Sequence, residues 1–210
     1  NILGGNKNKN GNYELFGIEF SQYIKADFDF VKNFAIDNRN SLVFHTAFGI
    51  AIPYGNSTMI PYEKRYFSGG ANSVRGWSVS SLGPGRYKGT DGNIDFINQT
   101  GDMKLDMNLE YRTRLMGKLD GAVFVDAGNI WTLRYYEEQP GGQFDISTFY
   151  EQLAVGYGVV LRLNFDFFTL RFDMGMKAVN PAYTGRKHYP ILNHNFNRDF
   201  AFHFAVGMPF

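Results

Sequence analysis

The stretch DMKLDMNLEYRTRL, residues 102–115, alternates polar and apolar side chains almost without a break. Its even positions are polar or charged and include Asn108 and Glu110, whereas its odd positions, apart from Thr113, are apolar or aromatic. Side chains two residues apart lie on the same face of a β-strand. The stretch is therefore expected to form one long strand with a charged face and an apolar face.

The same period of two recurs along most of the chain. It predicts strands over residues 16–34, 42–52, 102–115, 118–131, 150–165, 168–178 and 199–210. Strands of soluble domains usually have about 5–6 residues, and several of these are much longer. The connections alternate between short turns, the first at 35–40, and long loops at 53–101, 132–149 and 179–198. This pattern is typical of outer-membrane β-barrels, whose short turns are periplasmic and whose long loops are extracellular.

Composition agrees with an all-β fold and excludes several functions. The 210 residues include 21 Phe, 13 Tyr and 24 Gly, and no apolar run approaches the length of a membrane-spanning helix. The net charge of +1 gives no electrostatic reason to expect nucleic acid, and the absence of Cys excludes disulfides and thiol chemistry. We expect a transmembrane antiparallel β-barrel. The alternative is a soluble β-sandwich or lipocalin-like barrel, whose apolar face would lie inside.

Seven strands are too few to close such a barrel. Single-chain bacterial barrels have even strand numbers from eight upward, and open sheet edges are not tolerated in lipid. We therefore expect residues 1–210 to form the C-terminal part of a larger barrel. Its missing strands would come from a preceding segment or from another chain. An eighth strand within residues 1–13 is a poor candidate, because residues 4–11 are rich in Asn and Gly.

The long loop at 53–101 is expected to pack inside the barrel. Its centre reads Ser73-Val74-Arg75-Gly76-Trp77, and it carries apolar residues that a solvated linker would not need. A buried Arg75 needs partners. Glu110 and Asp126 lie on the polar faces of the next two predicted strands, and a guanidinium makes planar, bidentate contacts with carboxylates. Arg75 is thus predicted to meet both carboxylates in the lumen.

Four motifs together resemble the BamA/TamA superfamily of outer-membrane assembly proteins, over the chain from about residue 16 to its end. They are Val74-Arg75-Gly76-Trp77, Asn108-Leu109-Glu110-Tyr111, Phe124-Val125-Asp126-Ala127-Gly128 and the terminal Phe210 after alternating aromatic residues. The family more commonly has Phe or Tyr at the position of Trp77. Residues 69–72 and 82–85 look closer to the TamA-like branch than to BamA.

The resemblance implies a sixteen-strand barrel that is not an enzyme and that inserts, assembles or translocates other proteins. It implies that Glu110, Asp126 and Gly128 receive the Arg75 loop. It also implies a lateral seam at the last strand, for which the candidate residues are Phe200, Phe202, Phe204, Gly207 and Phe210. The partners would be outer-membrane lipids, nascent outer-membrane proteins and accessory assembly subunits, with no cofactor. Pro209 cannot donate a ladder hydrogen bond, which is consistent either with a labile seam or with a frayed terminus.

Two other functions remain as alternatives. A passive pore or receptor barrel would lack an anchored loop and would be open at rest. An outer-membrane enzyme could use His45 or His203 with Asp27 or Asp29, but no nucleophile accompanies them. His188 and His194 are six residues apart, a spacing that suits no common metal site. Four aromatic residues near strand ends are expected to form an interfacial girdle (Tyr54, Tyr111, Trp131 and Tyr150).

Overall fold

A seven-stranded antiparallel sheet dominates the computed structural model, which describes residues 6–9, 11–90, 93–165, 167–208 and 210. The sheet order is β10-β9-β8-β7-β6-β5-β4, so each strand pairs with its neighbour along the chain. The strands are β4 (Tyr23–Ala35), β5 (Asn40–Pro53), β6 (Met103–Met116), β7 (Leu119–Trp131), β8 (Ala154–Asn164), β9 (Thr169–Val179) and β10 (Phe200–Val206). The prediction of an all-β antiparallel fold is confirmed.

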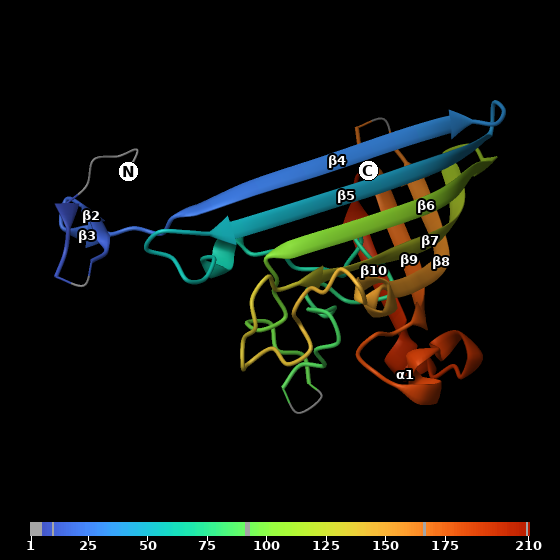
Figure 1. The fold of residues 1–210 in the computed structure, drawn as a ribbon. Coiled ribbons are helices and arrows are strands. Elements are labelled where there is room, and N and C mark those ends of the chain that lie inside the picture. The colour runs from blue at the N-terminus through green and yellow to red at the C-terminus, as the bar shows by residue number, and fades with distance from the viewer. Residues whose placement is uncertain (1–5, 10, 91–92, 166, 209) are drawn as a thin grey trace.

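Short and long connections lie at opposite ends of the sheet. Short connections join β4 to β5, β6 to β7 and β8 to β9, whereas residues 54–102, 132–153 and 180–199 form the long loops. Figure 1 shows β4, β5 and β6 side by side, the sheet curving behind them towards β10, and the loops gathered at one end. We call that end the long-loop end. Its short helical segments are η1 (Tyr62–Lys64), η2 (Phe149–Gln152), η3 (Gly185–His188), η4 (Pro190–Leu192) and α1 (Phe196–Asp199).

The two faces of the sheet have inverted polarity relative to a water-soluble sandwich. The outer face, which carries Leu109, Val125 and Phe204, leaves these side chains 44%, 49% and 59% exposed. The inner face carries Glu110 and Asp126, and both are 0% exposed. Alternation along each strand produces the two faces, and the loops cover the polar face of the central strands, whereas β4 is exposed along most of its length. This arrangement excludes the soluble alternative, in which the apolar face would be buried.

The N-terminal segment departs from the predicted strand over residues 16–34. The strand β4 begins only at Tyr23, and a separate small sheet precedes it, made of β1 (Asn6–Lys7), β2 (Tyr13–Leu15) and β3 (Ile18–Glu19). Phe16 and Gly17, with φ of 52° and 78°, form the two-residue turn between β2 and β3. The prediction was wrong because Phe16 in the turn, Ile18 in β3 and Phe20 after it happen to continue the period of two that runs through β4.

Trp131 and the last strand also differ from expectation. Trp131 is not a girdle residue, because it is 0% exposed, packs against Phe144 and Phe149, and donates its indole N–H to Gln152 at 2.6 Å. The last strand ends at Val206 instead of running to residue 210. Pro209 lies outside the described residues. None of the helices in the described part of the chain is long and apolar enough to span a membrane.

Candidate functional site: a loop docked on the inner face

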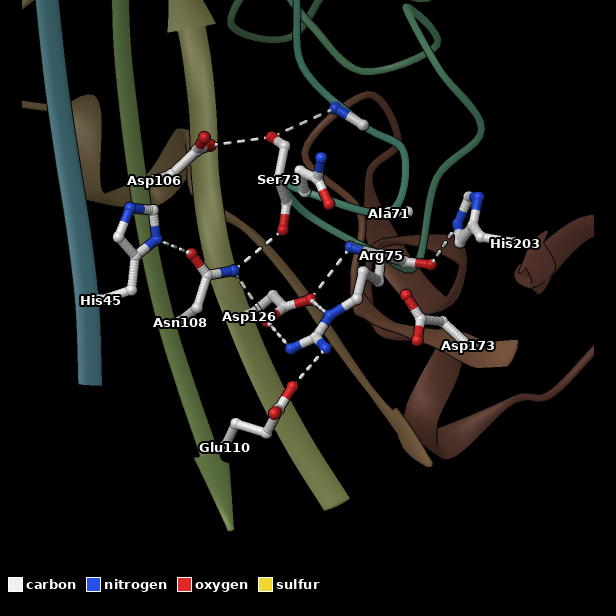
Figure 2. A network of polar contacts seen from close by, with 12 residues as sticks. His45, Ala71, Ser73, Arg75, Asp106, Asn108, Glu110, Asp126, Asp173 and His203 are labelled. Atoms are coloured by element: carbon white, nitrogen blue, oxygen red, sulfur yellow. Dashed lines mark hydrogen bonds and ion pairs between the residues drawn. The ribbon is translucent and has the colours of Figure 1, made fainter. Parts of the chain in front are cut away.

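The loop of residues 54–102 folds back from the long-loop end onto the inner face of the sheet. Val74, Trp77 and Leu82 form a buried apolar cluster with Ala154 of β8. Backbone hydrogen bonds between Tyr66 and Gly101, at 2.8 Å in each direction, close the base of the loop. Burial of the apolar side chains anchors the loop, and the polar centre of the loop is thereby brought against the inner face (Figure 2).

Arg75, at the tip of the docked segment, meets both predicted carboxylates. Its Nε and Nη2 donate hydrogen bonds of 2.8 Å to Oδ2 and Oδ1 of Asp126, and its backbone N–H donates to Oδ2 at 3.0 Å. Its Nη1 donates to Oε2 of Glu110 at 2.6 Å. The guanidinium carbon also lies 3.6 Å from the ring centroid of Phe124. Arg75 is 0% exposed, so the loop is held by a fully desolvated, bidentate ion pair.

Glu110 is shared among three guanidinium groups. Besides Arg75, its Oε1 accepts hydrogen bonds from Arg112 of the same strand and Arg162 of β8, each at 2.5 Å. Removal of one partner from such a buried network leaves an uncompensated charge, at a cost of about 3–5 kcal/mol. The docked loop therefore depends on a charge balance set by three neighbouring strands.

Glycines on β8 and β9 let the loop backbone approach the sheet. A Cβ atom at Gly175 would lie 2.2 Å from the carbonyl oxygen of Arg75, and one at Gly156 would lie 3.0 Å from the backbone nitrogen of Gly76. Any side chain at residue 175 would thus displace Arg75. Nothing in the sequence tells which strand glycines face the loop, so these two were not predicted.

Ser73 provides a second attachment, next to Gly128. Its hydroxyl donates to Asp106 at 2.9 Å, and its carbonyl oxygen accepts from the side-chain amide of Asn108 at 2.8 Å. Gly128 pairs with Asp106, whose Oδ1 lies 3.0 Å from the position of a Cβ on Gly128. Such a Cβ would lie nearer still, at 2.3 Å, to the backbone carbonyl oxygen of Leu105, so Gly128 leaves room for β6 and for the Asp106 side chain that binds Ser73.

Two further side chains reach the loop from β9 and β10. Arg171 donates to the carbonyl oxygen of Ala71 at 2.9 Å and to the side chain of Asn72 at 2.7 Å. His203 Nε2 lies 3.0 Å from the carbonyl oxygen of Arg75. Neither side chain was predicted as a partner of the loop, although both lie on the polar face of their strand and could have been proposed from that position.

The predicted seam residues divide between strand and lumen. Phe200 is the first residue of β10, which forms one edge of the sheet. Phe202 and Phe204, on the same strand, are 56% and 59% exposed. Gly207 directly follows the strand with φ of 98°. Phe210 lies outside β10, and its ring stacks on His45 of β5 at 4.7 Å. Phe210 is therefore a residue of the inner face, which differs from its predicted place in the last strand.

The histidines considered for catalysis or metal binding lie in separate contacts. His45 meets Asp29 at 3.1 Å, whereas Asp27 accepts from the hydroxyl of Tyr66 at 2.7 Å. His188 Nδ1 lies 3.0 Å from the carbonyl oxygens of Asn180 and Tyr183, and His194 contacts Tyr157 at 3.1 Å. Within the described ranges, no three His, Cys, Asp or Glu residues are grouped as metal ligands.

The outer part of the loop is ordered by Asp95. The pKa of Asp95 is lowered to about 2 by hydrogen bonds that outweigh the opposing effect of burial. The donors are the hydroxyl of Thr90, the side-chain and backbone amides of Asn98 and the backbone N–H of Ile97. The Asp95 carboxylate therefore stays charged at neutral pH and keeps these hydrogen bonds.

Comparison with known proteins gives one family for most of the chain. The Omp85 superfamily domain matches residues 8–210. The outer membrane protein assembly factor BamA of Neisseria meningitidis is 29% identical over 122 residues, which are 56% of this chain and 15% of that protein.

A solved structure of a BamA protein shows the same fold. The crystal structure of BamA from Haemophilus ducreyi lacking POTRA domains 1–3 superposes with a TM-score of 0.62 at 16% identity, over 89% of this chain and 35% of that one. CdiB from Acinetobacter baumannii gives a TM-score of 0.49 at 17% identity, over 89% of this chain and 27% of that one. The chain thus spans a minor part of the proteins it matches. The Omp85 match over residues 8–210 confirms the predicted family resemblance, and the preference for the TamA-like branch stays a prediction.

Proposed function

The chain belongs to the Omp85 superfamily, and from this premise we propose that it forms the C-terminal part of a bacterial outer-membrane β-barrel that inserts, assembles or translocates other proteins. The remaining strands would come from a preceding segment or from another chain. In this placement the long-loop end is extracellular, and the C-terminus follows β10 towards the periplasmic side, with the Phe210 ring against His45 on the inner face. The role is not enzymatic: the barrel offers a site of assembly to its client proteins.

The observation that carries the proposal is the anchored loop. A barrel that only conducts solutes needs an open lumen, whereas here Arg75 is fully buried between Asp126 and Glu110 on the inner face. The outer face has the apolar, aromatic character that lipid requires, with Phe202 and Val123 each more than half exposed. A lipid-facing sheet with a docked loop in its lumen suits a gated assembly barrel.

We assign the seam to β10, which forms one edge of the sheet. An edge strand presents unpaired N–H and C=O groups that can pair with a strand of another chain. Nascent outer-membrane proteins are the clients that this chemistry fits, with outer-membrane lipids and accessory assembly subunits as further partners. No nucleic acid is involved, given the net charge of +1.

A charge-reversal pair tests the proposal in the protein as cells make it. Arg75→Glu places a third carboxylate beside Asp126 and Glu110, and is expected to lower heat-modifiability and the levels of outer-membrane proteins in cells. Adding Asp126→Arg restores an opposite-charge pair and is expected to recover part of both. If Arg75→Glu changes neither readout, the loop is not an internal plug, and a passive pore or receptor barrel becomes the better interpretation.

A further inference from the structure

A cavity of about 270 Å³ lies at the long-loop end, between the docked loop and the last long loop, residues 180–199. The end of β9 and the start of β10 complete its walls. Among its lining residues, six polar or aromatic side chains carry the argument below (Trp77, Lys88, Gln99, Lys177, Asn180 and Arg198). Three of them are cationic, and in the described part of the chain no Asp or Glu lines the cavity. The chemistry of the walls therefore favours an anion.

Two buried side-chain amides in the wall have their oxygen engaged and their nitrogen free. Gln99 and Asn180 are 3% and 4% exposed. The Gln99 Oε1 accepts from the backbone N–H of Asp95 at 2.9 Å, and the Asn180 Oδ1 accepts from that of Ala182 at 3.2 Å. These N–H groups fix the orientation of both amides, because an amide nitrogen in the same place would face another donor. Neither amide nitrogen donates a hydrogen bond to any residue that the structure describes, so both favour a ligand that accepts.

Two lysines in the wall lack a counter-charge. Lys177 is half-buried on β9, where its Nζ donates to the carbonyl oxygen of Arg198 at 2.9 Å and lies 5.3 Å from the ring centroid of Trp77. An ammonium group has three N–H donors, so this contact uses only one of them. Arg198 pairs with Asp199 at 2.7 Å, whereas Lys88 and Lys177 form no ion pair within the described ranges. A half-buried charge without a partner is unfavourable, and an anion in the cavity would compensate it.

We propose that this cavity binds the phosphate group of a phosphorylated sugar and that the bound group fastens the docked loop to β9 and to the last long loop. A phosphate monoester carries a charge of about −1.5 to −2 at pH 7 and three strong acceptor oxygens. These match two uncompensated lysines and two free amide nitrogens better than a carboxylate, which has one charge and two oxygens. Trp77 and Tyr183, which also lines the cavity, offer apolar surface to the sugar ring.

The site goes beyond the proposed function, because it concerns a small ligand and not a client protein. Its consequence for the docked loop follows from where the donors come from. Lys88 and Gln99 belong to the docked loop, whereas Lys177 and Asn180 belong to β9 and to the residue that follows it. A phosphate held by both pairs joins segments that are about 80 or more positions apart in the sequence. Release of the docked loop would then require the ligand to leave or to lose half of its donors.

Titration of glucose 6-phosphate into the complete protein in neutral detergent micelles, followed by calorimetry, tests the site, with unphosphorylated glucose as the reference. Lys88→Met removes an exposed charge, and Gln99→Glu keeps the acceptor for Asp95 while adding a negative charge. Each is expected to weaken binding by about tenfold or more, because charge-assisted hydrogen bonds are lost. Lys187→Met, an exposed lysine of η3 outside the cavity, is the control and should bind as the wild type does.

Three results would overturn the proposal: no saturable binding of glucose 6-phosphate, equal binding of glucose, or undiminished binding in both Lys88→Met and Gln99→Glu. Binding of a tetraglutamate peptide in place of the sugar phosphate would also overturn it, in favour of an acidic protein segment. Unchanged heat-modifiability of each variant checks that its barrel is folded.

A second arm distinguishes a lipid headgroup from a soluble ligand. The protein is placed in phosphatidylcholine nanodiscs with or without monophosphoryl lipid A, and the titration is repeated. Weaker apparent binding of glucose 6-phosphate in the presence of the glycolipid would show that a lipid headgroup reaches the site. Equal binding with and without it would assign the site to phosphorylated sugars in solution. Either outcome supports the shared phosphate chemistry.

Trypsin cleavage after Arg75 reads the fastening of the loop, because Arg75 is 0% exposed and is cut only when the loop leaves the inner face. Saturating glucose 6-phosphate should slow this cleavage several-fold in the wild type and in Lys187→Met. It should have little effect in Lys88→Met. Cleavage that is equally fast with and without the saturating ligand in the wild type would refute the claim that the bound phosphate holds the loop.

Discussion

The imidazole Nε2 of His203 lies 3.0 Å from the backbone carbonyl oxygen of Arg75, so the edge strand β10 contacts the docked loop at a fully buried residue. A carbonyl oxygen only accepts hydrogen bonds, so Nε2 must donate. The proposed seam and the anchor of the loop therefore share one hydrogen bond. Movement of β10 away from the sheet would remove it.

His203→Leu is expected to loosen the loop, because a buried carbonyl that loses its donor is destabilised by about 1–3 kcal/mol. The measurement is the rate of trypsin cleavage after Arg75 in micelles. His203→Gln offers an N–H donor at similar reach and should restore most of the protection. Equal cleavage of the Leu and Gln variants would show that the hydrogen bond contributes nothing to docking.

Gly175→Ala should push the loop off β9, since the new Cβ would lie 2.2 Å from the carbonyl oxygen of Arg75. Such overpacking costs about 1–3 kcal/mol, and 1.4 kcal/mol corresponds to about a tenfold change in an equilibrium. Cleavage after Arg75 should therefore rise by about tenfold. Gly121→Ala is the matched control on β7, where the atoms nearest to the new Cβ belong to the end of the Leu115 side chain, from 3.1 Å. A similar rise in this control would point to general loss of sheet stability.

Glu110→Gln should lower the temperature at which the barrel unfolds in detergent. The change leaves Arg75, Arg112 and Arg162 around a neutral amide, and loss of one member of a buried ion network costs about 3–5 kcal/mol. The exposed Glu63→Gln in η1 is the control and should leave the temperature unchanged. Adding Arg162→Gln removes the surplus charge and should recover part of the loss. No recovery would mean that geometry, and not charge balance, makes Glu110 necessary.

Val125→Arg tests which face meets lipid. Val125 is 49% exposed on the outer face near the middle of β7, where an arginine facing hydrocarbon costs about 2–4 kcal/mol. The variant should reach the outer membrane in reduced amount, measured by membrane fractionation and heat-modifiability. Val79→Arg, in the loop and 57% exposed, makes the same chemical change outside the sheet and should be tolerated. Equal tolerance of both would contradict a lipid-facing outer surface.

The period of two was enough to predict the seven strands and their two faces, because each strand has one apolar face and one polar face. It failed at Phe16, where a two-residue turn of positive φ preserves the alternation. It also failed at Trp131, because an aromatic residue at a strand end looks the same whether lipid or a folded loop covers it. Local pattern reports which residues share a face and does not report what lies against that face.

The sequence by itself determined the all-β class, the polarity of the faces and the candidate set Arg75, Glu110 and Asp126, since these follow from alternation and from the need of a buried guanidinium for carboxylates. Only the tertiary structure decided that Asn108 and Ser73 bind next to this set, that Gly175 admits the loop, and that His203 and Phe210 enter the same space. Those contacts join residues far apart in the chain. They depend on the register of the strands and on the path of the loop. Packing of the whole sheet fixes both, and no local stretch of sequence encodes them.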